Sequence, residues 1–204
     1  FGIVQGGAFS DLRDESALHI TGIPFPGYAI GGLAVGESKA ELYQIAGQVA
    51  GQLPQDKPRY LMGVGSPEDL VECVARGVDM FDCVLPTRVA RNGALFTRTG
   101  RVDITKRRFA DQAKPLDEDC DCYGCRNFSA AYLWHLFKAK ELLALRLATM
   151  HNLRFILRLM KDMREAILKD RFGDFQREFW DVYRPTDEAA RQAQKDKWLK
   201  ARGG

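Results

Sequence analysis

The first hundred residues alternate short apolar segments with segments that have the spacing of amphipathic helices. The apolar segments predict strands at residues 2–4, 27–30, 60–62 and 80–84, and the predicted helices occupy residues 11–20, 39–51 and 67–76. Strand–helix units of this length, repeated along a chain, indicate a parallel sheet with helices packed on its outside. The alternation therefore predicts an α/β fold for residues 1–100.

Each predicted strand ends in a glycine-rich or polar loop, at residues 5–7, 31–32, 63–65 and 82–83. In a (β/α)8 TIM barrel, the active site is built from residues at these carboxyl ends of the strands. The units found here amount to half of such a barrel, and an isolated half leaves two sheet edges unpaired. Residues 1–7 read as a buried strand running into a glycine turn, which is typical of the middle of a fold.

Composition and hydropathy are ordinary. The chain has 204 residues, 46% of them hydrophobic and 28% charged, which suits one well-buried domain or one domain with a small appendage. No apolar run approaches the roughly 20 residues needed to cross a bilayer, and nothing near Phe1 resembles a signal sequence. We therefore expect a cytoplasmic protein that makes no membrane contact.

The pattern changes after Pro86. We expect a hairpin or loop at residues 98–103, a metal-binding knuckle at 115–125 and helices at 129–147 and 149–169. The second helix carries apolar residues at core-facing spacing, namely Leu153, Ile156, Leu157, Met160 and Met163. A short aromatic helix follows, with Phe172, Phe175, Phe179 and Tyr183 spaced for core packing. We divide the chain into a half barrel (1–100), a zinc-binding subdomain with closing helices (101–183) and a polar tail (184–204).

Three thiols lie within six residues, at Cys120, Cys122 and Cys125. Cysteines at C-x-C-x2-C spacing can converge on one tetrahedral ion, which needs one further donor. His135 and His151 lie on the predicted helices downstream. The chain has 5 cysteines, an odd number, and no signal peptide, which favours structural Zn2+ over a disulfide pair. A closed four-ligand site leaves no open position for chemistry, so the catalytic function lies elsewhere.

Basic residues are concentrated in two places, although the net charge is only +3. Residues 88–108 hold seven basic side chains against Asp103, and residues 191–202 hold five against Asp196. Such clusters attract a polyanion, although a charge run is just as often a solvated face.

Several of these segments together resemble bacterial tRNA-guanine transglycosylase (queuine tRNA-ribosyltransferase). The likeness runs from Phe1 to about Tyr183 and includes the thiol knuckle with its following helix. The segments that carry it are Gly2-Ile3-Val4-Gln5-Gly6, residues 31–37, Tyr60-Leu61-Met62-Gly63-Val64-Gly65, residues 81–88, Arg91-Asn92-Gly93 and Pro115-Leu116-Asp117. The resemblance identifies the chain as the C-terminal half of such an enzyme.

The family exchanges the wobble guanine of certain tRNAs for a 7-deazaguanine base, and bacterial members insert the aminomethyl form. The resemblance implies a carboxylate that attacks the ribose anomeric carbon, and Asp82 occupies that position. Displacing a base at C1′ passes through an oxocarbenium-like state, where a carboxylate can form a covalent glycosyl intermediate. Asp79, three residues earlier, is the competing carboxylate.

The resemblance also implies base recognition by Gln5, Gly31, Gly32 and Leu33. An amide side chain can both donate to and accept from a purine edge, and glycines let main-chain groups approach a flat ligand. By the same resemblance, Glu37 matches a family position near the substituent of the base. Val35 matches the bacterial members, which insert the aminomethyl base. Two more, Tyr60 and Met62, line the pocket and stack on the base, or else pack as ordinary strand-end residues.

Arg88 and Arg91 follow the nucleophile and are placed to grip phosphates of the flipped-out nucleotide, so the expected partner is the tRNA anticodon arm. For zinc, the family's fourth ligand corresponds to His151, which leaves His135 and His19 on the surface. The family forms homodimers through its zinc-bearing region, so a homodimer is expected by resemblance.

The family's first barrel half, with a general acid/base aspartate and a further base-recognition aspartate, has no counterpart in these residues. We therefore predict that the chain alone has no transglycosylase activity. The alternative is a non-catalytic zinc-stapled module for tRNA binding or subunit docking, but such a module has no need of Asp82, Gln5 and the glycine pair. A different barrel lyase or glycosidase is disfavoured by the zinc knuckle and the basic loops.

Overall fold

The computed structural model describes residues 1–33 and 36–186. Val35 and most of the polar tail lie outside the described residues, so the predictions for them stay predictions.

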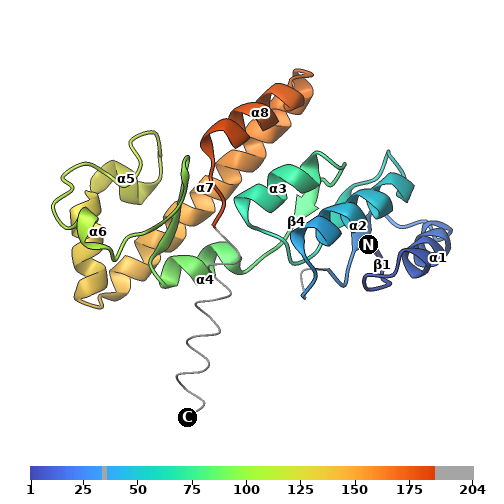
Figure 1. Ribbon diagram of the computed structural model, residues 1–204, viewed down its shortest axis with the longest axis horizontal. Coiled ribbons are helices and arrows are strands. Elements are labelled where there is room, and N and C mark those ends of the chain that lie inside the picture. Colours follow the sequence, from blue (N-terminus) through green and yellow to red (C-terminus); the bar gives the residue numbers. More distant parts are fainter. Residues whose placement is uncertain (34–35, 187–204) are drawn as a thin grey trace, which may run out of the picture.

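A parallel sheet forms the first part of the chain, as predicted (Figure 1). Its strands lie in the order β1 (Gly2–Val4), β2 (Tyr28–Ile30), β3 (Arg59–Leu61) and β4 (Met80–Phe81). The helices between them are α1 (Ser10–Thr21), α2 (Lys39–Gln52) and α3 (Pro67–Val74). Among the described residues the sheet is open, with β1 and β4 at its edges, and no closed barrel is formed.

The fourth strand is shorter than predicted. It ends at Phe81 instead of residue 84, because Val84 already has helical dihedral angles and α4 (Leu85–Arg91) begins directly after it with Pro86 in its first turn. Proline is favoured in the first turn of a helix and disfavoured in a sheet interior. The residues after Phe81 are therefore a strand-to-helix turn.

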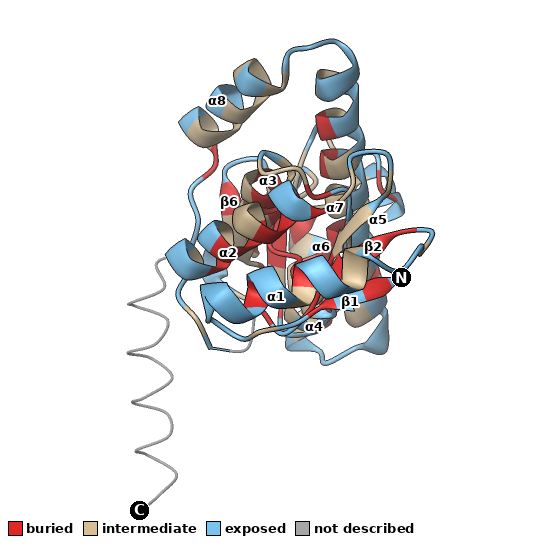
Figure 2. Cartoon of the chain, turned by 90° about the vertical axis from the view of Figure 1, so that its right-hand side faces the viewer, coloured by how far each residue is buried: buried red, intermediate tan, exposed pale blue. Residues whose placement is uncertain are grey.

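The two faces of the sheet differ. Residues paired across parallel strands point to the same face, so Val4, Ile30 and Leu61 form one row, and each is 0% exposed under the helices. Figure 2 shows that α1 and α2 bury their inner residues and expose their outer faces. The opposite row contains Ile3, which is 40% exposed, and Met80, which is 44% exposed. Helices therefore cover one face of the sheet, while the other is open.

The second part of the chain is built on one long helix, α7 (Leu142–Leu168). In Figure 1 it runs from α5 (Tyr123–Asn127) and α6 (Ala130–Lys138) to α8 (Phe172–Val182), and it contacts α3 and α4 on the way. The predicted hairpin is β5 (Ala94–Thr97) paired antiparallel with β6 (Gly100–Asp103), and a short 3-10 turn, η1 (Arg107–Phe109), follows.

The predicted boundary between the two long helices was wrong. The break lies at residues 139–141, where Lys140 has φ 58° and the amides of Lys140 and Glu141 bond to the carbonyls of Phe137 and Leu136. This is a Schellman motif, which usually has glycine at the left-handed position. The sequence has lysine there, so it carries no visible stop signal.

The predicted core face of α7 was partly wrong. Met163 is 1% exposed, and Ile156 and Met160 pack in the same cluster near α3 and α8. Leu153 and Leu157 are instead 41% and 63% exposed, because they lie on the side of α7 that faces away from that cluster.

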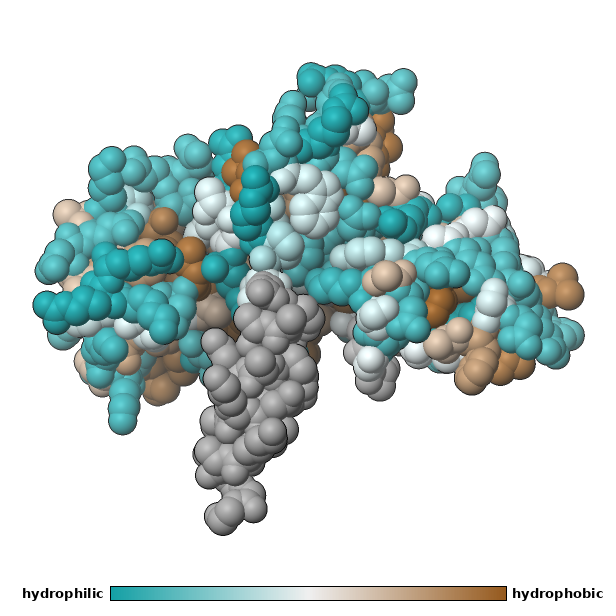
Figure 3. All heavy atoms as spheres, viewed as in Figure 1, coloured by the Kyte–Doolittle hydropathy of each residue, from teal (hydrophilic) through white to brown (hydrophobic). Residues whose placement is uncertain are grey.

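Apolar side chains are also exposed at the α1 end of the molecule, where Figure 3 shows brown patches. Phe9, Leu12 and Leu18 are 66%, 48% and 73% exposed. No helix in residues 1–33 and 36–186 is long and apolar enough to cross a membrane.

Candidate active site and metal centre

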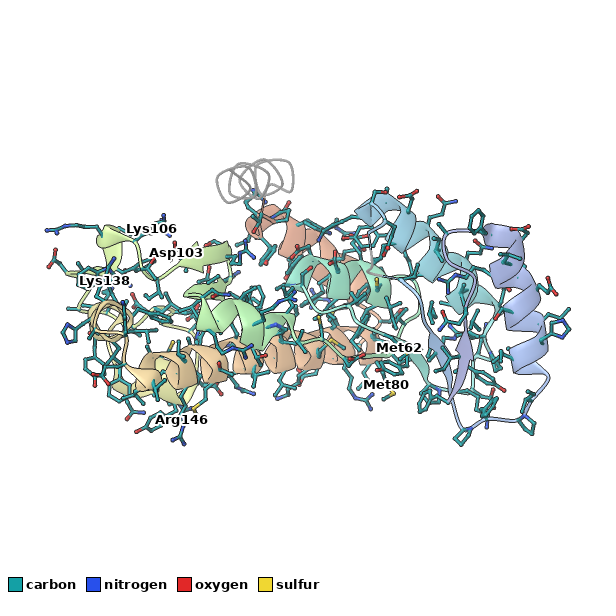
Figure 4. The ribbon with its side chains drawn as sticks, turned by 90° about the horizontal axis from the view of Figure 1, so that it is seen from below. Met62, Met80, Asp103, Lys106, Lys138 and Arg146 are labelled. Carbon is teal, nitrogen blue, oxygen red and sulfur yellow. The ribbon has the colours of Figure 1, made fainter. Side chains whose placement is uncertain are left out.

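The strand register brings four predicted site residues into one row. The amides of Gly31 and Met62 bond to the carbonyls of Val4 (3.0 Å) and Ile30 (3.1 Å), which continues the parallel ladder one step beyond the strands. By alternation, the positions directly after the strands belong to the open face of the sheet. These positions are occupied by Gln5, Gly31, Met62 and Asp82. Figure 4 shows Met62 beside Met80 of the neighbouring strand on this face.

Gln5 lies directly on the glycine pair. A Cβ added to Gly31 would be 2.5 Å from Gln5 Nε2, and one added to Gly32 would be 2.5 Å from Gln5 Oε1. Gly32 also has φ +66°, which L side chains rarely adopt. Only glycine at both positions lets the Gln5 amide lie this close to the main chain, with the buried Leu33 next along the chain.

Asp82 is held as a carboxylate. Its Oδ1 accepts a hydrogen bond from the Tyr60 hydroxyl at 2.5 Å and another from the Gly63 amide at 3.1 Å. These donors, the Tyr60 hydroxyl first, hold the pKa of Asp82 below its usual value, and the same bond raises the pKa of Tyr60. Asp82 is exposed, so a ligand on the open face can reach a charged, oriented oxygen.

Asp79, the competing carboxylate, lies at the other end of β4. Its Oδ2 accepts a hydrogen bond from the Arg59 amide at 2.8 Å, at the start of β3. It therefore ties together the amino ends of two strands, away from the row that contains Asp82.

The loop between β2 and α2, which contains Gly31, Gly32 and Glu37, ends in a helix cap. The Ser38 hydroxyl accepts from the Glu41 amide at 3.2 Å, and the Glu41 carboxylate accepts from the Ser38 amide at 2.8 Å. The cap residue Ser38 of this capping box directly follows Glu37, and α2 begins at Lys39. Lys39 then pairs with Glu68 at 2.9 Å and Asp69 at 2.7 Å, which fastens the start of α2 to α3.

Sequence reasoning missed Arg13, the largest fully buried side chain among the described residues. Its position in α1, between two strands, looks like an ordinary place for a surface arginine. The structure instead directs its guanidinium into the strand ends, against the carbonyls of Val4, Gly7, Gly31 and Gly32.

The predicted metal ligands come together. Cys120, Cys122, Cys125 and His151 place their ligand atoms within 4.8 Å of one another. The three sulfurs lie 3.6, 3.6 and 3.4 Å from His151 Nδ1. The first three residues come from the turn that begins α5, and His151 comes from the middle of α7. These four residues can hold one metal ion.

The second ring nitrogen of His151 fixes the orientation of the ligand. Nε2 lies 2.7 Å from the carbonyl oxygen of Phe96, which can only accept, so Nε2 carries the proton and Nδ1 offers its lone pair to the cluster. His135 and His19 are exposed, as predicted.

Asn152 is a second residue that sequence reasoning missed. It is 0% exposed, accepts from the Phe96 amide at 3.0 Å, and donates to the carbonyls of Pro86 and Ala94, each at 3.0 Å. It therefore joins α7 to β5 and to the start of α4, directly beside the candidate metal ligand His151.

Surface charges flank the metal knuckle. Arg154 of α7 donates to both carboxylate oxygens of Asp121, at 2.6 and 2.7 Å. These bonds hold the pKa of Asp121 near 2. Because Asp121 lies between two ligands, this exposed pair docks the knuckle on α7.

Arg88 and Arg91 are both exposed on α4, the helix that follows Asp82. Neither forms an ion pair with any described residue. Lys106, from the same basic run, lies at the α6 end of the molecule, away from Met62 on the sheet (Figure 4).

The sequence profile of queuine tRNA-ribosyltransferase matches residues 1–185. The chain belongs to this family. The queuine tRNA-ribosyltransferase of Dehalococcoides mccartyi strain BAV1 is 55% identical over 204 residues, which are 100% of this chain and 52% of that protein. Those of Caldanaerobacter subterraneus subsp. tengcongensis and Staphylococcus aureus strain JH9 are 60% and 56% identical over 183 residues, 90% of this chain and 49% and 48% of theirs. The chain thus spans about half the length of the curated queuine tRNA-ribosyltransferases it matches.

The Tyr60 hydroxyl predicts a change in the titration of Asp82. Removing it in Tyr60→Phe should raise the pKa of Asp82 towards its ordinary value, because a donor to the charged form is lost. A depressed pKa keeps the carboxylate charged until the pH falls through that value, so the variant should begin to protonate at higher pH. NMR titration of the Asp82 carboxyl carbon measures this shift.

The matched control is Tyr43→Phe, which removes a tyrosine hydroxyl bound to Asp69 at 2.6 Å. It should leave the titration of Asp82 unchanged. An unaltered Asp82 pKa in Tyr60→Phe would contradict the assignment of Tyr60 as its principal donor.

Proposed function

We propose that the chain supplies the nucleophile and base-recognition part of a tRNA-guanine transglycosylase site, which replaces the wobble guanine of tRNA with 7-aminomethyl-7-deazaguanine. The observation that carries this proposal is the ionised, doubly hydrogen-bonded Asp82 in one row with Gln5 and Gly31. The family supports it, since the name queuine tRNA-ribosyltransferase describes joining a base to a ribose of tRNA. The proposed enzyme is a pentosyltransferase.

In the first step, Asp82 attacks C1′ of the nucleotide. Both Tyr60 and Gly63 donate to Oδ1, so we assign the attack to Oδ2. A bond forms between Oδ2 and C1′, and the C1′–N9 bond breaks with its electron pair going to guanine. The product is a glycosyl ester of Asp82, as in retaining glycosidases.

In the second step, N9 of the incoming base attacks C1′ and the ester bond breaks, which restores the Asp82 carboxylate. The proton that the departing guanine gains and the incoming base loses requires a general acid/base. The sequence has no counterpart of the family's general acid/base aspartate. We therefore still predict that this chain, without the rest of the enzyme, is inactive.

The base lies between the open face of the sheet and the loop after β2, which contains Gly31 and Gly32. The Gln5 amide and the main chain at Gly31, Gly32 and Leu33 read its edge, and Glu37 meets the aminomethyl substituent. Met62 lines the pocket. For Tyr60 the hydrogen bond to Asp82 favours an orienting role over stacking on the base.

The RNA lies along α4. The charges of Arg88 and Arg91, close in sequence to Asp82, suit the phosphates on either side of a flipped-out nucleotide. The anticodon arm of tRNA is the partner, so the enzyme works in the cytoplasm.

The metal ion is structural zinc. Tetrahedral Zn–S and Zn–N bonds of about 2.3 and 2.0 Å would separate sulfur and nitrogen by about 3.5 Å. The observed sulfur–nitrogen separations of 3.4–3.6 Å match this value. When bound, zinc supplies folding energy and no chemistry.

The open sheet is half of a (β/α)8 barrel, and strands beyond β1 and β4 complete it. The partly exposed row with Ile3 and Met80 is the inner face of that barrel. The enzyme is a homodimer through its zinc-bearing region, as expected from the resemblance.

The zinc assignment predicts the effect of losing one thiol. Cys122→Ser should abolish the one bound zinc per chain and lower the unfolding midpoint, because structural zinc contributes on the order of 10 kcal/mol at neutral pH. Elemental analysis and thermal unfolding measure both effects. Cys73→Ala, which alters a buried thiol outside the cluster, should retain the metal. Full zinc content in Cys122→Ser would contradict the assignment.

The transglycosylase proposal is tested in an extended chain, which joins this chain to the part of the Dehalococcoides mccartyi relative that it does not match. The extended chain should incorporate labelled guanine into a wobble-guanine tRNA. Asp82→Asn should lower the rate at least ~10^3-fold, because an amide is a poor nucleophile, whereas Asp79→Asn should retain exchange.

Equal exchange by wild type and Asp82→Asn would assign the covalent role to another carboxylate. Tight tRNA binding without exchange in either would favour the non-catalytic docking module.

A further inference from the structure

We propose that Arg13 is a positioning residue for the base pocket: its buried guanidinium locks the loop after β1 to the loop after β2 and so presents main-chain amides to the base. This inference rests on the proposed function. The Gly31 amide bonds to the Val4 carbonyl, and Arg13 adds contacts that reach further into both loops, to Gly7 and Gly32.

The contacts of Arg13 join the two loops. Nε donates to the carbonyl of Gly7 at 2.9 Å, and Nη1 donates to Val4 at 3.2 Å, all within the β1 side. Nη1 also donates to Gly31 at 2.7 Å, and Nη2 donates to Gly32 at 3.3 Å, on the β2 side. One planar group therefore sets the spacing of two loops that are far apart in sequence.

The burial of Arg13 is costly unless its donors are satisfied. The residue is 0% exposed, and its burial lowers the pKa of the guanidinium while the charge of Glu37 acts to raise it. Carbonyl acceptors around a rigid fork meet this requirement, whereas the single ammonium of lysine cannot reach the same set. The site therefore demands arginine in particular.

The direction of the carbonyls determines what the opposite side presents. In a trans peptide, C=O and N–H point in opposite directions. Because the carbonyls of Gly31 and Gly32 point at Arg13, the amides of Gly32 and Leu33 point away from it. Among residues 1–33 and 36–186, no acceptor is recorded for either amide.

Arg59 provides a matched control. It also donates to main-chain carbonyls, at 2.8 Å to Leu53 and 3.4 Å to Gly77, but it lies at the start of β3. Its loops are at the amino ends of the strands, away from Asp82. Replacing it tests the loss of a similar arginine without changing the base pocket.

The experiment compares Arg13→Lys, Arg13→Gln and Arg59→Lys in the extended chain. We expect KM for guanine to rise about 10-fold or more in both Arg13 variants with kcat and KM for tRNA changed less than about 3-fold, since uniform binding of the base is lost. Hydrogen exchange at residues 31–33 should rise in the Arg13 variants. Arg59→Lys should leave KM for guanine and this exchange unchanged.

Unchanged KM for guanine and unchanged hydrogen exchange in the Arg13 variants would overturn the inference, as would an equal rise in Arg59→Lys. The proposed function would stand in either case, because wild type still exchanges guanine. If an Arg13 variant is too unstable for kinetics, hydrogen exchange is measured below its unfolding temperature. Faster exchange confined to residues 31–33 supports the inference, whereas faster exchange in all loops reflects only general destabilisation and contradicts it. If the wild-type extended chain fails to exchange guanine, the proposed function is refuted, and the inference with it.

Discussion

The parallel hydrogen-bond ladder between β1, β2, β3 and β4 is the constraint on which the candidate site depends. Each strand contributes two or three residues, yet the register aligns the positions that follow them, and main-chain bonds at Gly31 and Met62 extend it. Residues that are distant in sequence thus meet on the open face of the sheet, at the carboxyl ends of its strands. A shift of one residue in any strand would turn its site residue into the helix-covered side.

The candidate metal centre and Asp82 belong to one connected framework. His151 bonds to the carbonyl of Phe96, and its neighbour Asn152 bonds to the amide of Phe96 and to the carbonyl of Pro86. Pro86 lies in the first turn of α4, four residues after Asp82. Hydrogen bonds from α7 therefore connect the cysteine–histidine cluster to the start of α4.

Features set by local sequence could be predicted, and features set by distant contacts could not. The spacing of Cys120, Cys122 and Cys125, the strand–helix alternation and the motif around Asp82 are all local patterns, and the structure brings the four proposed metal ligands together. The burial of Arg13, the Tyr60–Asp82 bond and the Asn152 contacts depend on loops brought together by folding. The helix end at Lys140 escaped prediction because the usual glycine is missing.

The decisive measurement is to map the proposed covalent intermediate between Asp82 and the ribose of tRNA. The extended chain is mixed with a wobble-guanine tRNA, denatured and digested, and the peptides are examined by mass spectrometry. We expect a ribose-linked RNA fragment esterified to the peptide that contains Asp82, and no such adduct in Asp82→Asn. An adduct on a different carboxylate, or guanine exchange without any adduct on the Asp82 peptide, would contradict it.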